Sequence, residues 1–575
     1  MAETVAILGG GIGGLTAAHE LAERGFTVRV YERKGIFGGK ARSIPVPGSA
    51  TAGRKALPGE HGFRFFPSFY RHLPDTMARI PFGTNRRGVL DNLVPTTGTI
   101  LARAGQADLA LLARFPRDRE EWRIAVVGLR TFLRLIPPTE MLYYLWRWLV
   151  WATSCHERRL HEYEHLPWWE FTRAAGRSPA YQQFLGHGLT RLLVAIRAEE
   201  SSTRTTGAIG FQLFQGLLTR GTDVDRVLCG PTNEVWIDPW VRHLERLGAL
   251  CQLEATVRQI HTDGHRVTHV TVERAGRATA VTADHYVAAL PVEVMTALLT
   301  PELASAAPSL ANIGRLRTAW MNGMQFYLAQ DVPITRGHAV YVDSPWALTS
   351  VSQHQFWEGV DLTEYGDGRV RGILSVDISD WESPGLLYGR PARECTAEEI
   401  KNEVWAQLMA HLDPPVQRAL AQATVLHWFL DPDIEFPNPS QAVNVEPLLL
   451  NTIGSLADRP EARTEIENLF LAADYVRTHT DLASMEAANE AARRAVNALL
   501  RAAGSPAPRA TLWPLSEPAV FQRPKAWDRL LFERGRPHSL GKAFRAALGR
   551  WIGGGRGRGR IGSSSPDGRA TPGAA

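Results

Sequence analysis

The hydrophobic pattern of the first forty residues predicts a strand, a helix and a second strand. A short apolar run begins at Val5 and ends at Leu8, and a glycine-rich stretch follows it. A helix then opens with small residues, and a second apolar run ends in the acidic Glu32. This order is typical of a β-α-β unit.

The pattern changes several times along the rest of the chain. Long helical segments rich in aromatic side chains are predicted from about 105 to 220. Strand-like patterns follow at 251–260, 267–272, 280–282 and 283–291, and again at 320–328, 338–342 and 372–378, before a helix near 400–412. Strands mixed with helices in this way favour an α/β protein with an added α+β region.

The glycines after the first strand have the spacing of a dinucleotide fingerprint. Gly9 permits a tight turn, Gly11 lets the backbone approach a pyrophosphate, and Gly14 lets the helix pack on the strand. The acid at the end of the second strand would bind the ribose hydroxyls. The predicted nucleotide-binding residues are Gly9, Gly11, Gly13, Gly14, Glu32 and Arg33. NAD and FAD share this fingerprint, so these residues alone leave the nucleotide open.

Composition narrows the class of protein. The chain has 575 residues, 44% of them hydrophobic, which is enough for two or three domains with sizeable cores. Its formal charge of +5 is modest and concentrated near the C-terminus, so we expect no nucleic-acid partner. The four cysteines form no close pair, and no signal peptide precedes the first strand. The apolar run 141–153 is too short to cross a bilayer. We therefore expect a cytoplasmic protein that is soluble or lies on a membrane.

Two further segments carry a resemblance to a known family. Gly38-Gly39-Lys40 and Arg42 follow the acidic strand end, and Glu60-His61-Gly62-Phe63-Arg64-Phe65-Phe66 comes soon after. These segments resemble the FAD-dependent amine oxidase and phytoene desaturase superfamily, although the Phe65-Phe66 pair falls one residue earlier than in carotenoid desaturases. The resemblance implies FAD rather than NAD, with Gly39, Lys40 and Arg42 near the pyrophosphate and Gly62 and Phe63 behind the flavin ring. Because no cysteine falls in either flavin motif, we expect the FAD to be non-covalent.

A second motif lies near the other end of the chain. Residues 459–490 are similar to the closing FAD motif of the same desaturases, with Ala473 and Ala487 where glycine is usual and Val476 where threonine is usual. The resemblance implies that Asp474 holds the ribityl and pyrophosphate region, and that Ser484 and Met485 open a helix towards the flavin. It also implies that Val257 meets the adenine through its backbone.

Together these features predict the fold class: α/β, with a Rossmann-type FAD-binding domain and an inserted α+β substrate domain. Residues 1–105, 222–298 and 446–505 would form the FAD-binding domain, and 106–221 with 299–445 the substrate domain. A helical extension would follow at 506–552, with a basic amphipathic helix at 539–551. The glycine- and arginine-rich residues 553–575 would form a disordered tail.

The chemistry is predicted from what the flavin supplies and from which residues are absent. No lysine occurs between Lys55 and Lys401, which disfavours the amine oxidase branch, because its members place a lysine near the flavin. We expect a desaturase-like enzyme in which flavin N5 carries the hydride. His61 and Arg64 are candidates for proton transfer by sequence proximity alone. His161 and His165 match H-E-x-x-H, but Pro167 should end their helix too early for a metal site, so we predict no metal.

Several alternatives stay open at this point. The enzyme could dehydrogenate a polyene acyl chain, act like a hydroxysqualene dehydroxylase, or be a redox-neutral isomerase. The expected substrate is a small apolar molecule taken from a membrane surface or from a carrier protein. The electron acceptor, a quinone or O2, is not identified by the sequence.

Overall fold

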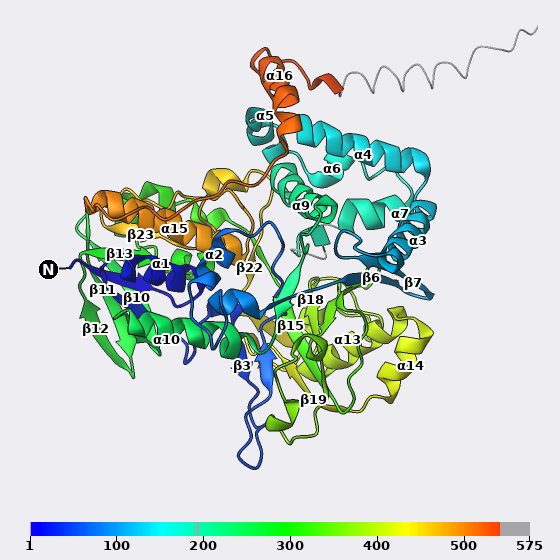
Figure 1. The fold of residues 1–575 in the computed structure, drawn as a ribbon. Coiled ribbons are helices and arrows are strands. Elements are labelled where there is room, and N and C mark those ends of the chain that lie inside the picture. The colour runs from blue at the N-terminus through cyan, green and yellow to red at the C-terminus, as the bar shows by residue number, and fades with distance from the viewer. Residues whose placement is uncertain (1, 189, 192–194, 541–575) are drawn as a thin grey trace, which may run out of the picture.

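The computed structural model describes residues 2–188, 190, 191 and 195–540 (Figure 1). Its first layer is a parallel sheet of five strands in the order β23-β13-β1-β2-β9. The strands β1, β13 and β23 are almost entirely buried, as strands inside a parallel sheet should be, whereas β2 and the edge strand β9 are partly exposed. The strands are β1 (Thr4–Leu8), β2 (Thr27–Tyr31), β9 (Leu250–Gln252), β13 (His285–Ala288) and β23 (Leu469–Leu471).

Three helices form one layer against this sheet. Helix α1 (Ile12–Ala22) packs along α15 (Met485–Ala502), and its other neighbour is α10 (Asp238–Arg246). Figure 1 shows α1 between α15 and α10, and these two helices contact β23 and β9, the strands at the two edges of the sheet. A three-stranded antiparallel meander, β10 (Ala255–Thr262), β11 (Val267–Arg274) and β12 (Arg277–Val281), lies at the same end of the molecule.

A second, mixed sheet has seven strands in the order β19-β15-β18-β17-β16-β6-β7. Helix α13 (Ala397–His411) packs apolar side chains against this sheet and is followed by α14 (Pro414–Gln422). The strands are β6 (Gly98–Arg103), β7 (Gln106–Leu112), β15 (Asn322–Leu328), β16 (Gly337–Tyr341), β17 (Thr349–Ser352), β18 (Gly372–Ile378) and β19 (Val425–Leu430).

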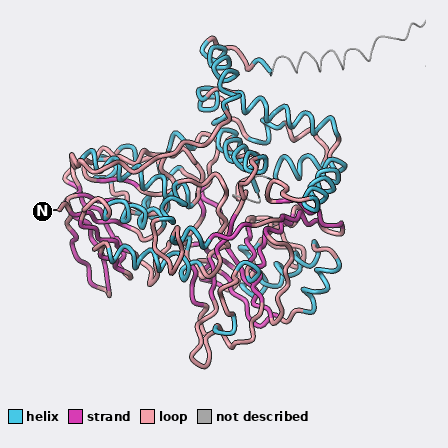
Figure 2. Tube along the Cα trace, in the orientation of Figure 1, coloured by secondary structure: helices cyan, strands magenta, loops and turns pink. Residues whose placement is uncertain are grey.

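The third part is a helical lobe, which Figure 2 shows as helices joined by short loops above the second sheet. It contains α3 (Arg119–Leu135), α4 (Pro138–Thr153), α5 (His156–His161), α6 (Trp168–Thr172), α7 (Pro179–Tyr181) and α9 (Thr203–Leu218). The late helix α16 (Gln522–Glu533) returns to this lobe, where Asp528 accepts hydrogen bonds from Arg158 and from the Cys155 backbone N–H. None of the helices in the described part of the chain has the length and apolar character needed to cross a membrane.

Most elements predicted from the pattern are confirmed, with two corrections. The single strand predicted at 251–260 is two strands in different sheets, β9 and β10, because Glu254 takes a positive φ of 55° and turns the chain between them. The all-helical segment predicted from 105 begins with β7, and β6 pairs beside it in the second sheet. Residues 233–237 form a π-helical turn before α10. The tail 553–575 and nearly all of the helix predicted at 539–551 lie outside the described residues.

Candidate functional site

The glycine fingerprint forms the turn from β1 into α1. Gly9 has a φ of 106°, a conformation that favours glycine. A β-carbon on Gly14 would lie 1.9 Å from the Gly9 carbonyl oxygen, so only glycine permits this turn. Helix α1 has no side-chain cap and no acidic residue in its first turn. Its free N–H groups and positive helix end therefore form a ready site for an anion such as a pyrophosphate.

The acid at the end of β2 lies beside this turn. Glu32 is buried, and its carboxylate accepts hydrogen bonds from the backbone N–H groups of Gly10 at 2.8 Å and Lys34 at 2.9 Å. Burial raises its pKa. Each carboxylate oxygen keeps a lone pair for a further donor, as binding of ribose hydroxyls would require. Arg33 points elsewhere, since its guanidinium donates to Glu446 at 2.8 Å.

The second glycine turn packs directly on the first. Gly11 and Gly38 form a bridge, and a β-carbon on Gly39 would lie 2.9 Å from the Gly11 Cα atom. Lys40 projects from this turn, where its ammonium group donates to the Pro447 carbonyl and lies 3.7 Å from Glu293. Both Glu293 oxygens are buried and have no hydrogen-bond partner. The two glycine turns thus pack together, with Lys40 and the unsatisfied oxygens of Glu293 beside them.

Val257 lies on β10, close to the end of β2. The β10 strand starts with a hydrogen bond from the Ala255 N–H to the Glu32 carbonyl, 2.8 Å long. Val257 itself is partly exposed. The predicted adenine-contacting residue and the predicted ribose-binding acid are therefore close in space.

A buried ionic cluster extends from the second glycine turn. Arg42 donates to Asp433 and, at 3.0 Å, to Glu446, and Lys34 lies 2.7 Å from Asp433. Burial raises the pKa of Glu446, but Arg42 and Lys34 outweigh burial and lower the pKa to about 2. The Arg42 guanidinium is thus held by two carboxylates of the chain itself, whose positions the sequence pattern did not single out.

His61 extends the same cluster towards the second sheet. Its Nδ1 atom lies 2.5 Å from an Asp431 oxygen, which also accepts a 2.6 Å hydrogen bond from Asn322. Burial lowers the pKa of His61, but Asp431 and Asp433 outweigh burial and raise it overall. No protein partner of its Nε2 atom is found among the described residues. His61 and Asp431 therefore form a close imidazole–carboxylate ion pair, although Nδ1 makes no aligned hydrogen bond to Asp431.

Gly62 and Phe63 follow His61 in the chain and lie close to the carboxylate of Asp377. A β-carbon on Gly62 would lie 3.0 Å from an Asp377 oxygen, and the Phe63 N–H donates to that oxygen at 3.3 Å. Arg64 donates to the Lys40 carbonyl, while its buried Nε atom has no partner. Burial raises the pKa of Asp377 to about 7, although Arg64 opposes this shift.

Glu60 is a second carboxylate with a strongly raised pKa. It is fully buried and accepts hydrogen bonds from the Thr232 N–H at 3.1 Å and from the Thr232 hydroxyl. Burial raises its pKa to about 7, again against the influence of Arg64. Buried carboxylates with raised pKa values are typical of functional sites. The sequence did not single out Glu60 and Asp377 as functional candidates, because their burial is visible only in the three-dimensional structure.

The closing motif, residues 459–490, contributes further residues to the candidate site. Asp474 follows β23, is partly exposed, and makes no side-chain hydrogen bond to any described residue. Ser484 caps α15 by accepting a hydrogen bond from the Ala487 N–H at 3.2 Å, and the partly exposed Met485 is the first residue of that helix. Asp474 thus keeps its carboxylate free for a ligand.

The next residue of that motif has a role that the sequence did not predict. Glu486 accepts hydrogen bonds from the backbone N–H groups of Arg71, His72 and Leu73, between 2.7 and 2.9 Å long. It therefore caps α2 (His72–Ala78) from another helix.

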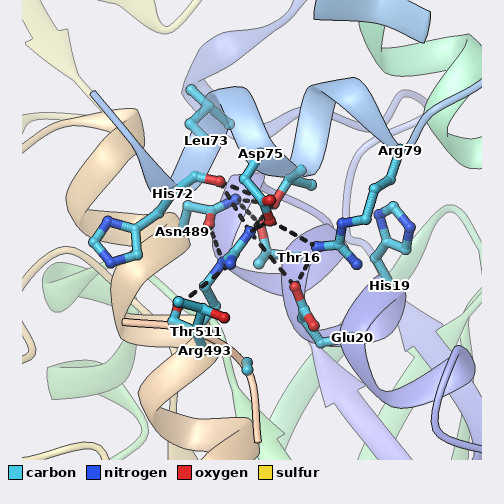
Figure 3. A network of polar contacts seen from close by, with 12 residues as sticks. Thr16, His19, Glu20, His72, Leu73, Asp75, Arg79, Asn489, Arg493 and Thr511 are labelled. Carbon is cyan, nitrogen blue, oxygen red and sulfur yellow. Dashed lines mark hydrogen bonds and ion pairs between the residues drawn. The ribbon is translucent and has the colours of Figure 1, made fainter. Parts of the chain in front are cut away.

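A polar network behind Glu486 holds three helices together (Figure 3). Buried Arg493 of α15 donates to Asp75, to the His72 carbonyl and to Asn489. Asn489 in turn donates to Thr16 of α1 at 2.8 Å. This network fixes α1 and α15, the two helices whose N-termini border the site, relative to each other.

A small cavity lies next to the start of α15. Leu482 and Ala483, directly before Ser484, form one side, and the first turns of α9 form the other. No acidic or basic side chain is among its described lining residues, which are Thr190, Ile196, Ser201, Thr205, Thr206, Ile209, Leu449, Asn451, Leu482 and Ala483. The cavity has a volume of about 30 Å³ and mostly apolar walls, so it suits an apolar group better than a charged one.

Two groups of histidine and acidic side chains lie close enough together to bind a metal ion. Their hydrogen bonds and ion pairs favour other roles. His19, Glu23 and His243 cluster between α1 and α10. His19 Nδ1 accepts from the Trp240 indole at 3.2 Å, so its Nε2 carries the proton shared with Glu23 and offers no lone pair to a metal. Of the two acids near His61, Asp433 is paired with Arg42 and Lys34, and Asp431 accepts a hydrogen bond from Asn322. The H-E-x-x-H residues do not share a helix, since α5 ends at His161 and His165 lies in a separate turn.

The arrangement fits FAD. It provides an uncapped helix end for the pyrophosphate, a carboxylate for the ribose, an unpartnered carboxylate at Asp474 and orphaned polar atoms on Glu293 and Arg64. Glycines at the points of closest approach leave room for the dinucleotide. When bound, FAD supplies a two-electron acceptor.

This chain is similar in sequence to known flavin-dependent proteins. The family model of the flavin containing amine oxidoreductases matches residues 12–500. A zeta-carotene desaturase from Synechocystis sp. is 24% identical over 529 residues, which cover 86% of this chain and 97% of the relative.

Solved structures are similar in fold. An oxidoreductase from Methanosarcina mazei has a TM-score of 0.56 at 13% identity, covering 87% of this chain and 100% of its own. A cyclohexylamine oxidase from Brevibacterium oxydans has a TM-score of 0.53 at 15% identity, covering 88% and 100%. The chain belongs to the flavin containing amine oxidoreductase family, and it is an FAD-dependent oxidoreductase.

Proposed function

We propose that this oxidoreductase dehydrogenates CH–CH groups in a long, apolar polyene or isoprenoid. The observation that carries the proposal is the cavity beside Ala483, whose described lining has no charged side chain. A substrate amine would be bound best by carboxylates or by an aromatic cage, whereas an isoprenoid chain needs only apolar walls. The similarity to a zeta-carotene desaturase over nearly the whole chain supports the same class of substrate.

The residues that would hold the cofactor are those of the two motifs. Gly9, Gly11, Gly13 and Gly14 would border the pyrophosphate, with Lys40 on the second glycine turn. Glu32 would bind the ribose and Val257 the adenine. Asp474 would hold the ribityl region, and Ser484 and Met485 would present the N-terminus of α15 to the flavin, where negative charge grows on reduction.

We further propose that His61 accepts the proton that leaves the carbon next to the oxidised one. Asp431 lies 2.5 Å from Nδ1, so Nε2 is the atom that would take the proton. Because Asp431 and Asp433 raise the pKa of His61, the resulting imidazolium is stabilised within the site. Arg64, the other candidate, stays protonated at neutral pH and would act through its charge.

Amine oxidation is the main competing function, since the family model and a structural relative carry that activity in their names. The absence of lysine between Lys55 and Lys401 and the uncharged cavity argue against it. Dehydrogenation of a polyene acyl chain, removal of a hydroxyl as in hydroxysqualene dehydroxylase, and redox-neutral isomerisation would use the same cavity. The products distinguish these reactions.

The substrate source follows from its solubility. A long apolar molecule must be taken from a bilayer or from a carrier protein, and we propose that the enzyme works as a peripheral protein on the inner face of a membrane. We propose that a quinone or O2 reoxidises the flavin.

The experiment is a product analysis with purified, flavin-loaded enzyme. An acyclic carotenoid precursor in vesicles, with a soluble quinone as acceptor, should give a product two hydrogens lighter for each quinone reduced. An aliphatic amine should give no turnover. Turnover of the amine alone would contradict the proposal, and a product of unchanged mass would indicate an isomerase.

A further inference from the structure

Helix α3 exposes an apolar stripe to solvent. Trp122, Val126, Leu129 and Leu133 are all exposed, with exposed fractions of 57% for both Val126 and Leu129. Their spacing of four, three and four residues places them on one helix face. The opposite face is fixed on the protein, because a β-carbon on Gly128 would lie 2.6 Å from the Ala110 carbonyl oxygen of β7. The stripe therefore points away from the body of the molecule.

Arginines accompany this stripe. Arg119, Arg123, Arg130 and Arg134 are exposed along α3, and none of them pairs with an acidic side chain of the described chain. The acids of this helix are confined to its start, where Asp118 caps it and Glu121 pairs with Arg114. No aspartate or glutamate occurs from residue 122 to residue 139. An exposed apolar stripe flanked by unpaired positive charge is typical of a helix that lies in a membrane interface.

The neighbouring helix continues the apolar surface. Helix α4 follows α3 after Pro137 and exposes Leu142, Leu145 and Leu149, with Leu142 exposed by 67%. Beyond the first turn of α4, every exposed side chain is a leucine. The exposed face of an ordinary solvated helix is polar. The two helices contact each other and belong to the same lobe (Figure 1).

Helix α9 connects this lobe to the cavity. Thr205, Thr206 and Ile209, near its start, line the cavity beside the α15 N-terminus. Phe214 and Leu218, near its end, are exposed, and Arg220 follows at the surface. One helix of sixteen residues, about 24 Å long, thus runs from the cavity to an exposed apolar end.

We propose that α3, α4 and the C-terminal turn of α9 form the surface by which this protein docks on an anionic phospholipid bilayer. Leucine, valine and tryptophan side chains would enter the acyl boundary, while the α3 arginines would bind lipid phosphates. Helix α9 would then guide an apolar substrate from the bilayer to the cavity. The inference deepens the proposed function and, in its last step, rests on it. The bilayer is favoured over a protein partner because the arginines, unpaired in the fold, match lipid phosphates along the whole stripe.

The test is sedimentation of the flavin-loaded, full-length protein with vesicles of phosphatidylglycerol and phosphatidylcholine. Wild type should sediment with them at low salt and dissociate as salt rises. The triple variant Val126→Gln, Leu129→Gln, Leu133→Gln should lose binding on the order of tenfold or more. The variant Arg123→Gln, Arg130→Gln, Arg134→Gln should lose about fivefold for each charge on these vesicles and nothing on pure phosphatidylcholine.

The matched control is Leu386→Gln with Leu387→Gln, an exposed apolar pair on a loop of the second sheet's region, which should bind like wild type. Flavin content and melting temperature verify folding, since all changed side chains are exposed. Equal vesicle binding by wild type and the α3 variants would overturn the proposal. A wild-type dimer that the apolar variant converts to a monomer, without vesicle binding by either, would also overturn it.

Binding is measured without substrate, so its failure is separate from that of the proposed function. A protein that docks through α3 but oxidises no polyene would contradict only the proposed function.

Discussion

Gly13 of α1 lies against the Ala472 carbonyl at the end of β23, so closely that a β-carbon on Gly13 would be 1.9 Å from that oxygen. The first FAD motif and the closing motif, at opposite ends of the chain, thus touch through a glycine. This contact brings together the two distant segments that would form the proposed cofactor site. It also explains why residue 13, which the G-x-G-x-x-G spacing leaves variable, is a glycine.

The contact predicts the effect of a single methyl group. Gly13→Ala should lower the free energy of unfolding by about 1–3 kcal/mol and reduce bound FAD, because α1 must move away from β23. Thermal unfolding and the ratio of flavin to protein absorbance measure these effects. Gly176→Ala is the control, since an added β-carbon there has no atom within 4 Å. Full flavin content and unchanged stability in Gly13→Ala would show that the contact is not tight.

The two acids of the cofactor site should be required for FAD binding. Glu32→Ala and Asp474→Ala each remove a charge-assisted hydrogen bond to the nucleotide, worth about 1.5–3 kcal/mol, so the FAD dissociation constant should rise about 10- to 100-fold. Titration of the apoprotein with FAD measures it. Glu435→Ala, which changes an exposed acid, should bind FAD like wild type. Normal affinity in both site variants would place the nucleotide elsewhere.

The bond to FAD should be non-covalent. The four cysteines, Cys155, Cys229, Cys251 and Cys395, lie outside both flavin motifs, so no thioether is expected. Acid or heat should release all the flavin as FAD, which chromatography of the supernatant detects. Flavin that stays with the precipitated protein would contradict this prediction.

Glu60 should make stability depend on pH. Its pKa is about 7 in the folded protein and near 4.5 in the unfolded chain, so the folded state binds more protons between these values. Stability should therefore fall as pH rises through this window, by up to about 3 kcal/mol. In Glu60→Gln this loss should disappear, which makes the variant more stable than wild type at about pH 8 and similar at about pH 4.5. Urea unfolding at both values tests the sign, and a variant that is less stable at high pH would contradict it.

The role of His61 predicts a pH profile for activity. As a proton acceptor it must be neutral, so kcat/KM should rise with pH through a pKa above the usual value for histidine. Asp431→Asn should move that midpoint to lower pH, because it removes a charge that raises the pKa. His61→Gln should lose activity by about 10²–10⁴-fold while keeping FAD. An unchanged midpoint in Asp431→Asn would assign the proton transfer to another group.

The parts of this site that depend on local structure could be predicted from the sequence. The β1-α1-β2 unit, the turn at Gly39 and the Ser484 cap are set by residues within one short segment, so their pattern is visible along the chain. The carboxylates that hold His61 and Arg42 were missed, because Asp431, Asp433 and Glu446 come from loops far away in sequence. The break at Glu254 was missed because a positive φ at a non-glycine residue has no sequence signal.

The most direct test of the central claim is anaerobic mixing of the FAD-loaded protein with an acyclic polyene precursor in anionic vesicles. The account predicts that the visible absorbance of oxidised flavin disappears and that one molecule of product, two hydrogens lighter, forms for each flavin reduced. Flavin that stays oxidised with every polyene tested, but is reduced by an aliphatic amine, would contradict the account.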